Sequence, residues 1–499
     1  MRYTITQAWF KYLLVLSLLV VAFFLRFEHL LARVFHIDEY ISMLAAQMTA
    51  LKGVPVFPSG LFYSQGLLVS YLTAPFLRLA GFSEEVARWP AVLIGVVTVA
   101  SYYLVGSRMS KSQAAGLFVL AFAALDVTMI LWSARVRMYA LAGLLMLLAL
   151  FFLAQGTFLN PHRRYRLAAV VCFLGAILAH SVSIAVLPVW GIAVIICVWL
   201  GHEKFQLNWY RQKSVGLEVV VSLLLLTLGL GFGVVGQIPF LSPGSGAGDG
   251  GSSVMGVLSK FLEPGVSWQR VDDYLYYYTS LSYWPLILLG GLAFLRALVS
   301  AVRGRLTRRD LATLFLGLVF LLTIAELSLV LTHTWRKTRY LFILCQAPFL
   351  LLAADGLARL IEYGSRLFAE QAKSAALIGT LLGIIGILVF WSNPAIAVAS
   401  VQGTGGYDTA FMWVKENWQE GDQVMTVHPS AAYLYLDRSD YYATQGTARV
   451  LLDEESEELI DRYVGSKLLD SVDALNKVDS EDGRLWYVVD KNRLFNRYN

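Results

Sequence analysis

Long apolar runs recur along the chain and are separated by short polar segments. A helix needs about 20 residues to cross the hydrocarbon core of a bilayer, and most runs approach that length. The candidate spans are 10–27, 89–106, 114–132, 138–156, 167–181, 184–200, 216–236, 284–300, 310–331, 340–358 and 375–392. The pattern therefore predicts a polytopic α-helical membrane protein with about eleven transmembrane helices.

Two apolar runs do not fit one simple crossing. The run 61–80 is long enough to span, but a crossing there would invert every later loop, so we expect its helices to lie on or dip into the outer face. The run 167–200 would be about 51 Å long as one helix. That length is too long for one passage and short for two. We expect the run to break at 180–183, because the basic loops at both ends require an even number of crossings.

Basic residues gather in alternate loops. The loops 108–113, 160–166, 201–214, 303–309 and 359–373, together with Arg2, Lys11 and Arg296, hold 18 of the 30 basic residues before Thr404. Cytoplasmic loops are enriched in lysine and arginine, so this pattern predicts a cytoplasmic N-terminus. The first span resembles a signal peptide, but no small-residue cleavage site follows it, and we interpret it as an uncleaved helix.

The charge changes sign near Gly403. From Thr404 onward there are 10 basic and 18 acidic residues, a net charge of −8, whereas the preceding 403 residues carry +13. We therefore expect a transmembrane domain at 1–403 and a soluble extracytoplasmic α/β domain at 404–499. In the latter, the periodicity predicts helices at 407–419 and 454–463 and strands at 423–427 and 485–489. It contains no glycine-rich phosphate loop.

Composition narrows the class further. The chain is 57% hydrophobic and only 15% charged, which excludes an ordinary soluble protein. All three cysteines lie in apolar runs, so neither a disulfide framework nor a zinc cluster is expected. Two long outer loops remain, at about 28–88 and 237–283. The second is rich in glycine and serine, and we expect it to be mobile. Its aromatic end, 272–284, fits either an interfacial belt or a lid over a bound lipid.

Two adjacent carboxylates, Asp38 and Glu39, follow the first span directly, with no neighbouring lysine or arginine in the sequence. One interpretation is structural: Asp38 caps a helix that begins there, and Glu39 lies in its first turn. The other interpretation is chemical, with the pair serving as catalytic carboxylates.

With the predicted orientation, other polar residues gather on the same outer side. They are Arg88, Asp126, Arg137, His180, Glu326 and the group Arg336, Lys337, Arg339 and Tyr340. The last group places three cations in a short outer loop, against the positive-inside rule. An anionic ligand such as a phosphate would explain it.

Several stretches of the first outer loop resemble a known family. They are Asp38-Glu39-Tyr40, residues 53–60, Tyr63 and residues 81–90; the turn 134–140 and Arg339-Tyr340 ahead of Pro348 also fit. The chain resembles the membrane glycosyltransferases of the GT-C fold, specifically the glycosyltransferase family 39 group, which includes protein O-mannosyltransferases and aminoarabinose transferases acting on lipid A. The resemblance covers residues 1 to about 392. No His-Pro-Pro-Leu stretch of the eukaryotic mannosyltransferases aligns, so a protein acceptor is not favoured.

The resemblance implies an inverting transfer from a polyprenyl-phosphate sugar to an acceptor hydroxyl or phosphate at the outer face. Asp38 would be the general base, and Glu39 would orient the acceptor or a metal. Arg336, Lys337 and Arg339 would hold the lipid phosphate.

Each of the remaining candidate residues has more than one possible role. Tyr340, Arg137 and Arg88 are candidate phosphate ligands, although Arg137 could instead pair with Asp126 and Arg88 could anchor a helix start. Asp126 is a further catalytic candidate. His180, Glu39 and Glu326 are candidates for a divalent metal or the acceptor, but no ligand spacing demands a metal.

Two other functions stay open: a lipid-linked-sugar flippase, and a non-catalytic subunit of a glycan assembly complex. The polar residues cluster on one face and no internal repeat is evident, which favours the enzyme over a transporter. Membrane lipids are expected partners and nucleic acid is not. A compact chain of this type fits a prokaryotic plasma or inner membrane, with the site facing the periplasm or exterior.

Overall fold

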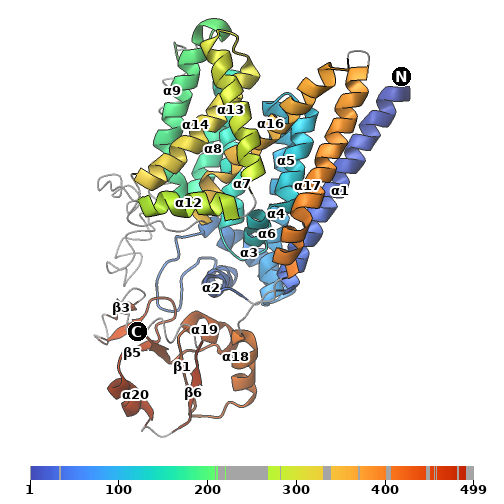
Figure 1. Ribbon diagram of the computed structural model, residues 1–499. Coiled ribbons are helices and arrows are strands. Elements are labelled where there is room, and N and C mark those ends of the chain that lie inside the picture. The colour runs from blue at the N-terminus through green and yellow to red at the C-terminus, as the bar shows by residue number, and fades with distance from the viewer. Residues whose placement is uncertain are drawn as a thin grey trace.

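The computed structural model describes residues 2–32, 35–207, 209–211, 220, 268–280, 283–329, 339–368, 371–400, 406–444, 450–453, 456, 458–479 and 483–490. These residues form a bundle of long helices with a small sheet domain at one end (Figure 1). We call this end of the bundle the domain face. The opposite end, where the chain begins, is called the N-terminal face.

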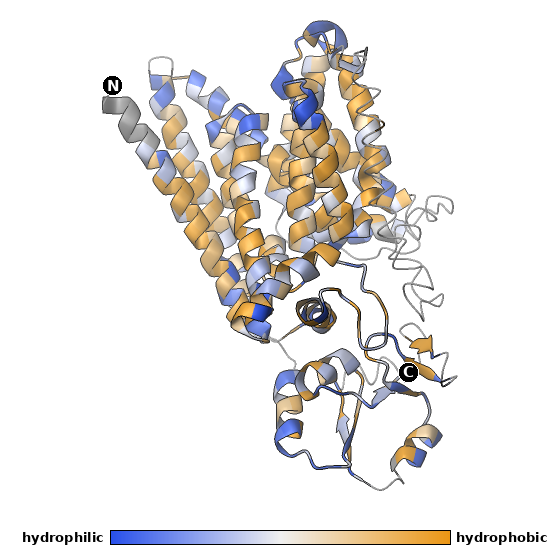
Figure 2. Cartoon of the chain, turned by 180° about the vertical axis from the view of Figure 1, so that it is seen from behind, coloured by the Kyte–Doolittle hydropathy of each residue, from blue (hydrophilic) through white to orange (hydrophobic). Residues whose placement is uncertain are grey.

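The bundle consists of helices whose residues are mostly hydrophobic (Figure 2). They are α1 (Arg2–Ala32), α4 (Glu84–Met109), α5 (Gln113–Leu125), α6 (Val127–Ser133), α7 (Tyr139–Ala154), α8 (Arg163–Ala179), α9 (Val186–Phe205), α13 (Trp284–Val302), α14 (Arg308–Leu329), α15 (Arg339–Leu344), α16 (Gln346–Arg366) and α17 (Ala372–Ser400). The shorter turns are η1 (Gln155–Leu159), η2 (Ser181–Ala185) and η3 (Trp209–Arg211). The protein is an integral membrane protein.

Eleven complete spans are not confirmed. Within the described residues, seven helices are long and apolar enough to cross a membrane, and the pair α5 and α6 makes an eighth if it counts as one span. That pair corresponds to the predicted span 114–132, and it bends by 61° at Asp126. The predicted span 340–358 is likewise divided, because α15 ends just before Cys345. Apart from Val220, the predicted span 216–236 lies outside the described residues.

The long run 167–200 breaks where the sequence predicted. Helix α8 ends at Ala179, and the 3-10 turn η2 separates it from α9. His180 lies at the break with an extended backbone, and its Nδ1 accepts a hydrogen bond from the amide of Val182 at 3.1 Å. A polar side chain thus caps the new helix at the point where the chain turns.

The first long loop folds onto the domain face as two helices, α2 (Ile37–Lys52) and α3 (Leu67–Ala80) (Figure 1). Helix α3 has 14 residues, too few to cross a bilayer, which agrees with the expectation that the run 61–80 stays at the surface. Gly53 ends α2 with a φ of +79°, a left-handed conformation that glycine adopts without steric cost.

The second long loop is mostly outside the described residues, so its predicted mobility is not tested. Its aromatic end forms helix α12 (Trp268–Ser280). Tyr274, Tyr277 and Tyr278 are buried, as is Tyr283 just beyond the helix, whereas Tyr276 is exposed. Most of these tyrosines therefore pack into the protein instead of forming an interfacial belt.

The C-terminal residues form the predicted α/β domain. Its sheet has the strand order β3-β4-β5-β2-β1-β6. Strands β5, β2, β1 and β6 are parallel to one another, and β4 is antiparallel to both of its neighbours, β3 and β5. The strands are β1 (Gln423–Thr426), β2 (Tyr441–Ala443), β3 (Val450–Leu452), β4 (Leu459–Asp461), β5 (Lys467–Leu469) and β6 (Leu485–Val488), and the helices are α18 (Tyr407–Glu416), α19 (Pro429–Leu436) and α20 (Val472–Asp479).

One element of this domain was predicted wrongly. The glutamate-rich segment 454–463 was expected to be a helix, but its described part contains strand β4, which pairs with β3 and β5. Glutamate favours helices locally, and here the pairing of β4 in the sheet overrides that preference.

The sheet domain packs directly on α2. Phe35 and Tyr40 share one apolar cluster with Tyr407, Phe411 and Val424 of the domain. The Nε2 atom of His428 lies 3.1 Å from the carbonyl oxygen of Ile37 in the first turn of α2. The two parts predicted as separate domains, 1–403 and 404–499, therefore share a core at α2.

Candidate active site at the domain face

Helix α2 begins with His36, and not Asp38, as its N-cap residue. His36 is the N-cap: its Nδ1 accepts from the amide of Asp38 at 3.3 Å, while Glu39 accepts from the amide of His36 at 2.7 Å. This reciprocal pair is a capping box. The interpretation of Asp38 as the N-cap is therefore wrong, because a histidine takes that place.

Two arginines from distant segments reach the carboxylate of Asp38. Arg339 Nη1 lies 3.2 Å from Asp38 Oδ2, and Arg137 Nη2 lies 3.7 Å from the same oxygen. Arg137 also donates to the carbonyl of Asp38 and to the hydroxyl of Ser42, both at 2.9 Å. The Asp38 side chain is 18% exposed, so it is held in place and still open to a ligand.

Positive charge exceeds negative charge around Asp38. Two guanidinium groups face one carboxylate, and the Nε atoms of Arg137 and Arg339 are buried without a hydrogen-bond partner among the described residues. Burial alone would lower the pKa of Arg137, but Tyr139 and Asp38 beside it raise that pKa above its usual value, so the group stays charged. Two cations held beside a single, partly exposed carboxylate suit an anionic ligand.

Aromatic rings pack against the guanidinium groups of the two arginines. The guanidinium of Arg339 lies 5.4 Å from the ring centre of Tyr139 and 5.6 Å from that of Tyr340, within the range of cation–π attraction. The ring of His180 contacts both tyrosines. We call Asp38, Arg137, Arg339, Tyr139, Tyr340 and His180 the Asp38 cluster. It joins the turn before α7, the α8–α9 break, α15 and α2.

Glu39 has a different environment from its neighbour. Its Oε1 accepts from Arg88 Nε and from the amide of Val136, both at 3.0 Å, and its Oε2 accepts from Arg88 Nη2 at 3.1 Å. Burial would raise the pKa of Glu39, but the charge and hydrogen bonds of Arg88 hold it below the ordinary value. These contacts favour a positioning role for the pair, which joins α2, α4 and the turn before α7.

Asp126 caps the bend inside the bundle. Its Oδ1 accepts from the amide of Met129 at 2.7 Å, and its Oδ2 accepts from the Tyr283 hydroxyl and, at 2.7 Å, from Gln346 Nε2. The alternative pairing of Asp126 with Arg137 is therefore wrong, because Arg137 pairs with Asp38. The structure gives Asp126 a role in holding the bend, apart from the Asp38 cluster.

Arg26 is a buried charged residue that sequence reasoning did not select. It is fully buried, its Nη2 donates to the carbonyl of Ala123 at 3.1 Å, and its Nε donates to Ser133 at 2.8 Å. It thus provides hydrogen bonds to backbone carbonyls at the C-terminal end of α5, while Asp126 caps the start of α6 on the other side of the bend. An arginine near the end of the first apolar span is the signal that could have identified it.

The other predicted residues are less constrained by the structure. Glu326 is buried in α14, and its Oε2 has no hydrogen-bond partner among the described residues. Arg336 and Lys337 lie outside the described residues. No group of three histidine, cysteine or acidic side chains gathers within metal-binding reach in the described part of the chain, and Glu39 is committed to Arg88, so the described residues do not fit a metal site built on Glu39 and His180.

Comparisons with known proteins bear on the fold. No protein-family model and no curated protein sequence matches this chain. Among solved structures, ArnT from Cupriavidus metallidurans in the apo state has a TM-score of 0.63 at 14% identity, covering 98% of this chain and 94% of that one. The same protein bound to undecaprenyl phosphate gives a TM-score of 0.62 at 14% identity, covering 97% and 94%.

A second neighbour is the archaeal oligosaccharyltransferase AglB from Archaeoglobus fulgidus, in complex with an inhibitory peptide and a dolichol-phosphate. Its TM-score is 0.54 at 12% identity, covering 86% of this chain and 64% of that chain. ArnT and AglB are both GT-C glycosyltransferases. The chain therefore has the GT-C fold that the sequence resemblance implied.

Proposed function

We propose that this protein is an inverting glycosyltransferase that moves a sugar from a polyprenyl-phosphate donor to an acceptor hydroxyl or phosphate. The observation that carries the proposal is the Asp38 carboxylate, partly open and set between two arginines with unused donors. Two structural neighbours are described with undecaprenyl phosphate and dolichol-phosphate, which supports a lipid phosphate as the anion.

The proposed reaction uses both signs of charge in the Asp38 cluster. The acceptor oxygen attacks the anomeric carbon, and its proton passes to Asp38. The bond from that carbon to the phosphate oxygen breaks, and the electron pair stays on the polyprenyl phosphate. Arg137 and Arg339 neutralise the charge of that leaving group. Before the donor binds, the same arginines pair with Asp38, and the phosphate would draw them away from it.

The remaining residues support this arrangement in our proposal. Tyr139 and Tyr340 hold the arginine side chains, and Glu39 and Arg88 fix the first turn of α2 against the rest of the site. Arg336 and Lys337 precede Arg339 in the sequence and would add to the phosphate site. We place the site on the periplasmic or exterior side of a prokaryotic membrane and leave the sugar as a hexosyl or pentosyl group.

The central test is transfer by Asp38→Asn beside wild type, with radiolabelled polyprenyl-phosphate sugars in membranes. A general base typically contributes about 10²–10⁴-fold, so we expect transfer to fall by at least about 100-fold while donor binding persists. Glu85→Gln is the matched control, since it removes an exposed carboxylate from the same loop. Equal transfer by Asp38→Asn and wild type would overturn the proposal.

The same preparation tests the alternative of a lipid-linked-sugar flippase. Wild-type protein in vesicles would then move labelled donor between leaflets while transferring nothing. The placement of the Asp38 cluster at one end of the bundle favours the enzyme, because a transport path needs polar groups near the middle of the membrane.

A further inference from the structure

Helices α13 and α16 cross tightly and then open toward the N-terminal face. At the crossing, a Cβ added to Gly356 would lie 2.1 Å from the carbonyl oxygen of Leu289, and one added to Gly290 would lie 3.3 Å from the side chain of Leu352. At Gly356 only glycine permits this approach, whereas a Cβ at Gly290 would require a small shift of Leu352. Beyond it, a cavity of about 470 Å³ lies between the two helices, with Leu292 and Arg296 on one wall and Leu360, Tyr363 and Arg366 on the other.

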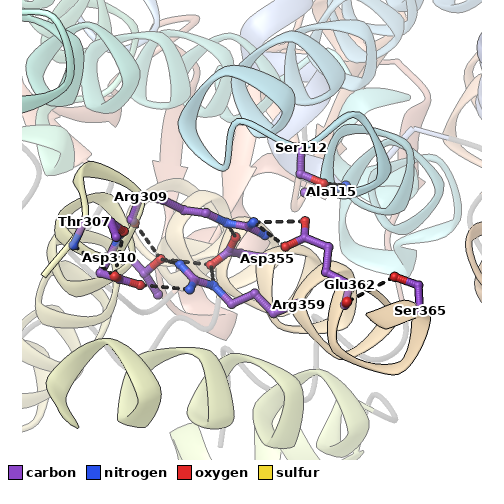
Figure 3. Close-up of polar contacts among 10 residues, drawn as sticks. Ser112, Ala115, Thr307, Arg309, Asp310, Asp355, Arg359, Glu362 and Ser365 are labelled. Carbon is purple, nitrogen blue, oxygen red and sulfur yellow. Dashed lines mark hydrogen bonds and ion pairs between the residues drawn. The ribbon is translucent and has the colours of Figure 1, made fainter. Parts of the chain in front are cut away.

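The carboxylates beside this cavity are already paired. Glu362, which lines it, accepts from Arg309 Nη1 with both oxygens, at 2.9 and 2.7 Å, and Arg309 also reaches Asp355 at 2.8 Å (Figure 3). Arg359 is held by Asp355 at 2.7 Å and by Asp310 at 2.8 Å. We call Arg309, Asp310, Asp355, Arg359 and Glu362 the carboxylate network.

The arginines at the mouth of the cavity have no such partners. Arg296 and Arg366 are exposed, and neither forms an ion pair within the described residues. An adjoining hollow of about 450 Å³ shares Leu292 and Arg296 and adds the exposed Arg303 and Arg305. The carboxylate network carries one more carboxylate than arginines, but the four exposed arginines of the two hollows outweigh it, so the net charge there is positive, which favours an anion.

The same cavity has a strongly apolar side. Leu292 is 54% exposed and Tyr363 is 70% exposed, and Leu288 and Leu295 continue the apolar surface along α13. In a membrane protein this exposed flank faces lipid tails. A free anion in water would gain nothing from such a surface, whereas a molecule with an anionic head and acyl chains would contact both parts.

We propose that this cavity is a binding site for an anionic phospholipid of the leaflet at the N-terminal face. Its phosphate lies between Arg296 and Arg366, and its acyl chains follow Leu292 and Leu288 along α13. Basic pockets between transmembrane helices bind such headgroups by charge. The site lies at the end of the bundle opposite the Asp38 cluster, and it does not depend on the proposed transfer reaction.

The test compares lipids that stay with the full-length protein. Wild type is reconstituted in nanodiscs of phosphatidylcholine containing one fifth phosphatidylglycerol, and the retained lipids are identified by native mass spectrometry after extraction into detergent. Near a membrane surface, two arginines favour an anionic lipid by about 10- to 30-fold. We expect enrichment of phosphatidylglycerol of that order, and its loss in Arg296→Ala/Arg366→Ala.

A matched control separates this site from general surface charge. Arg108→Ala/Lys111→Ala removes the same charge from another exposed segment of the N-terminal face and should keep the enrichment. The thermal unfolding of each variant in pure phosphatidylcholine shows whether it is folded. Equal enrichment in the cavity variant and the wild type, equal loss in both double variants, or displacement of the lipid by millimolar inorganic phosphate would each overturn the proposal.

Discussion

The Asp38 cluster and the carboxylate network use the same residue types at opposite ends of the bundle and balance them differently. In the network, two arginines face three carboxylates, and the two aspartates are almost fully buried. In the Asp38 cluster, two arginines face one carboxylate that is 18% exposed. Both sets keep buried arginine nitrogens without a hydrogen-bond partner among the described residues, Arg309 Nη2 in the network and the Nε atoms of Arg137 and Arg339 in the cluster, so the difference lies in the ratio of charges and in the exposure of the carboxylate.

We interpret this difference as that between a structural site and the proposed site for a ligand. A buried set of ions in which most hydrogen bonds are made resists change, since removing one member leaves a buried charge unpaired. A partly exposed set with surplus cations can accept an anion without leaving a buried charge unpaired. Perturbed and incompletely paired charges cluster at functional sites, and by this criterion the Asp38 cluster is the catalytic candidate of the two.

The largest expected effect on stability is at the network. Arg359→Leu should lower the free energy of unfolding by about 3–5 kcal/mol, because Asp310 and Asp355 would lose a buried partner. Thermal and chemical unfolding in detergent measures it. Transfer per folded molecule should stay within about twofold. Arg366→Leu, on the exposed side of the same helix, is the control. Equal destabilisation by both variants would contradict a structural role for the network.

The corresponding loss of an arginine at the Asp38 cluster should lower the rate of transfer more than the stability. Arg339→Ala is expected to reduce kcat/KM for the lipid donor by about 10²–10³-fold, as loss of one charge-stabilising donor does. Its stability should change little, since the pair with Asp38 is partly exposed. Arg78→Ala, an exposed cation on α3, is the control. A loss of transfer that merely follows the folded fraction would show that Arg339 is structural.

A smaller effect on stability is expected at the buried ion pair of Glu39 and Arg88, which lies at the domain face. Glu39→Gln should cost roughly 2 kcal/mol of stability, because Arg88 loses a charged acceptor. Since Arg88 lowers the pKa of Glu39, the wild type has this stabilisation above the ordinary pKa of about 4.3 and loses it as the pH falls through the folded value. Unfolding followed from pH 7 to pH 3 should therefore show a shallower decline in Glu39→Gln, and identical profiles would exclude this pair as the cause.

The smallest effect concerns the contact between the sheet domain and α2. His428→Phe keeps a ring against Tyr40 and Tyr407 but removes the hydrogen bond to the Ile37 carbonyl, which is worth about 1 kcal/mol. We expect kcat to fall by a few fold with KM for the donor unchanged, because the turn carrying Asp38 loosens. Steady-state kinetics at fixed pH measures this, and a change confined to KM would place His428 at the donor instead.

Local sequence signals were sufficient for several features. The apolar runs indicated the helical membrane class, His180 marked the break in the run 167–200, and the acidic C-terminal segment showed the pattern of an α/β fold. These features depend on hydropathy, charge and turn chemistry within a short window. The segment 454–463 failed under the same method, since sheet pairing outweighed its local preference for helix.

Partner choice was decided only by the tertiary structure. Asp38 and Glu39 are neighbours in the sequence, yet one faces Arg339, which is 301 residues away, and the other is held by Arg88, 49 residues away. Asp126 became the cap of a bend, with Tyr283 and Gln346 as partners. An ionised side chain takes its role from the charges and burial around it, and helix packing brings those groups together from segments that no local pattern connects.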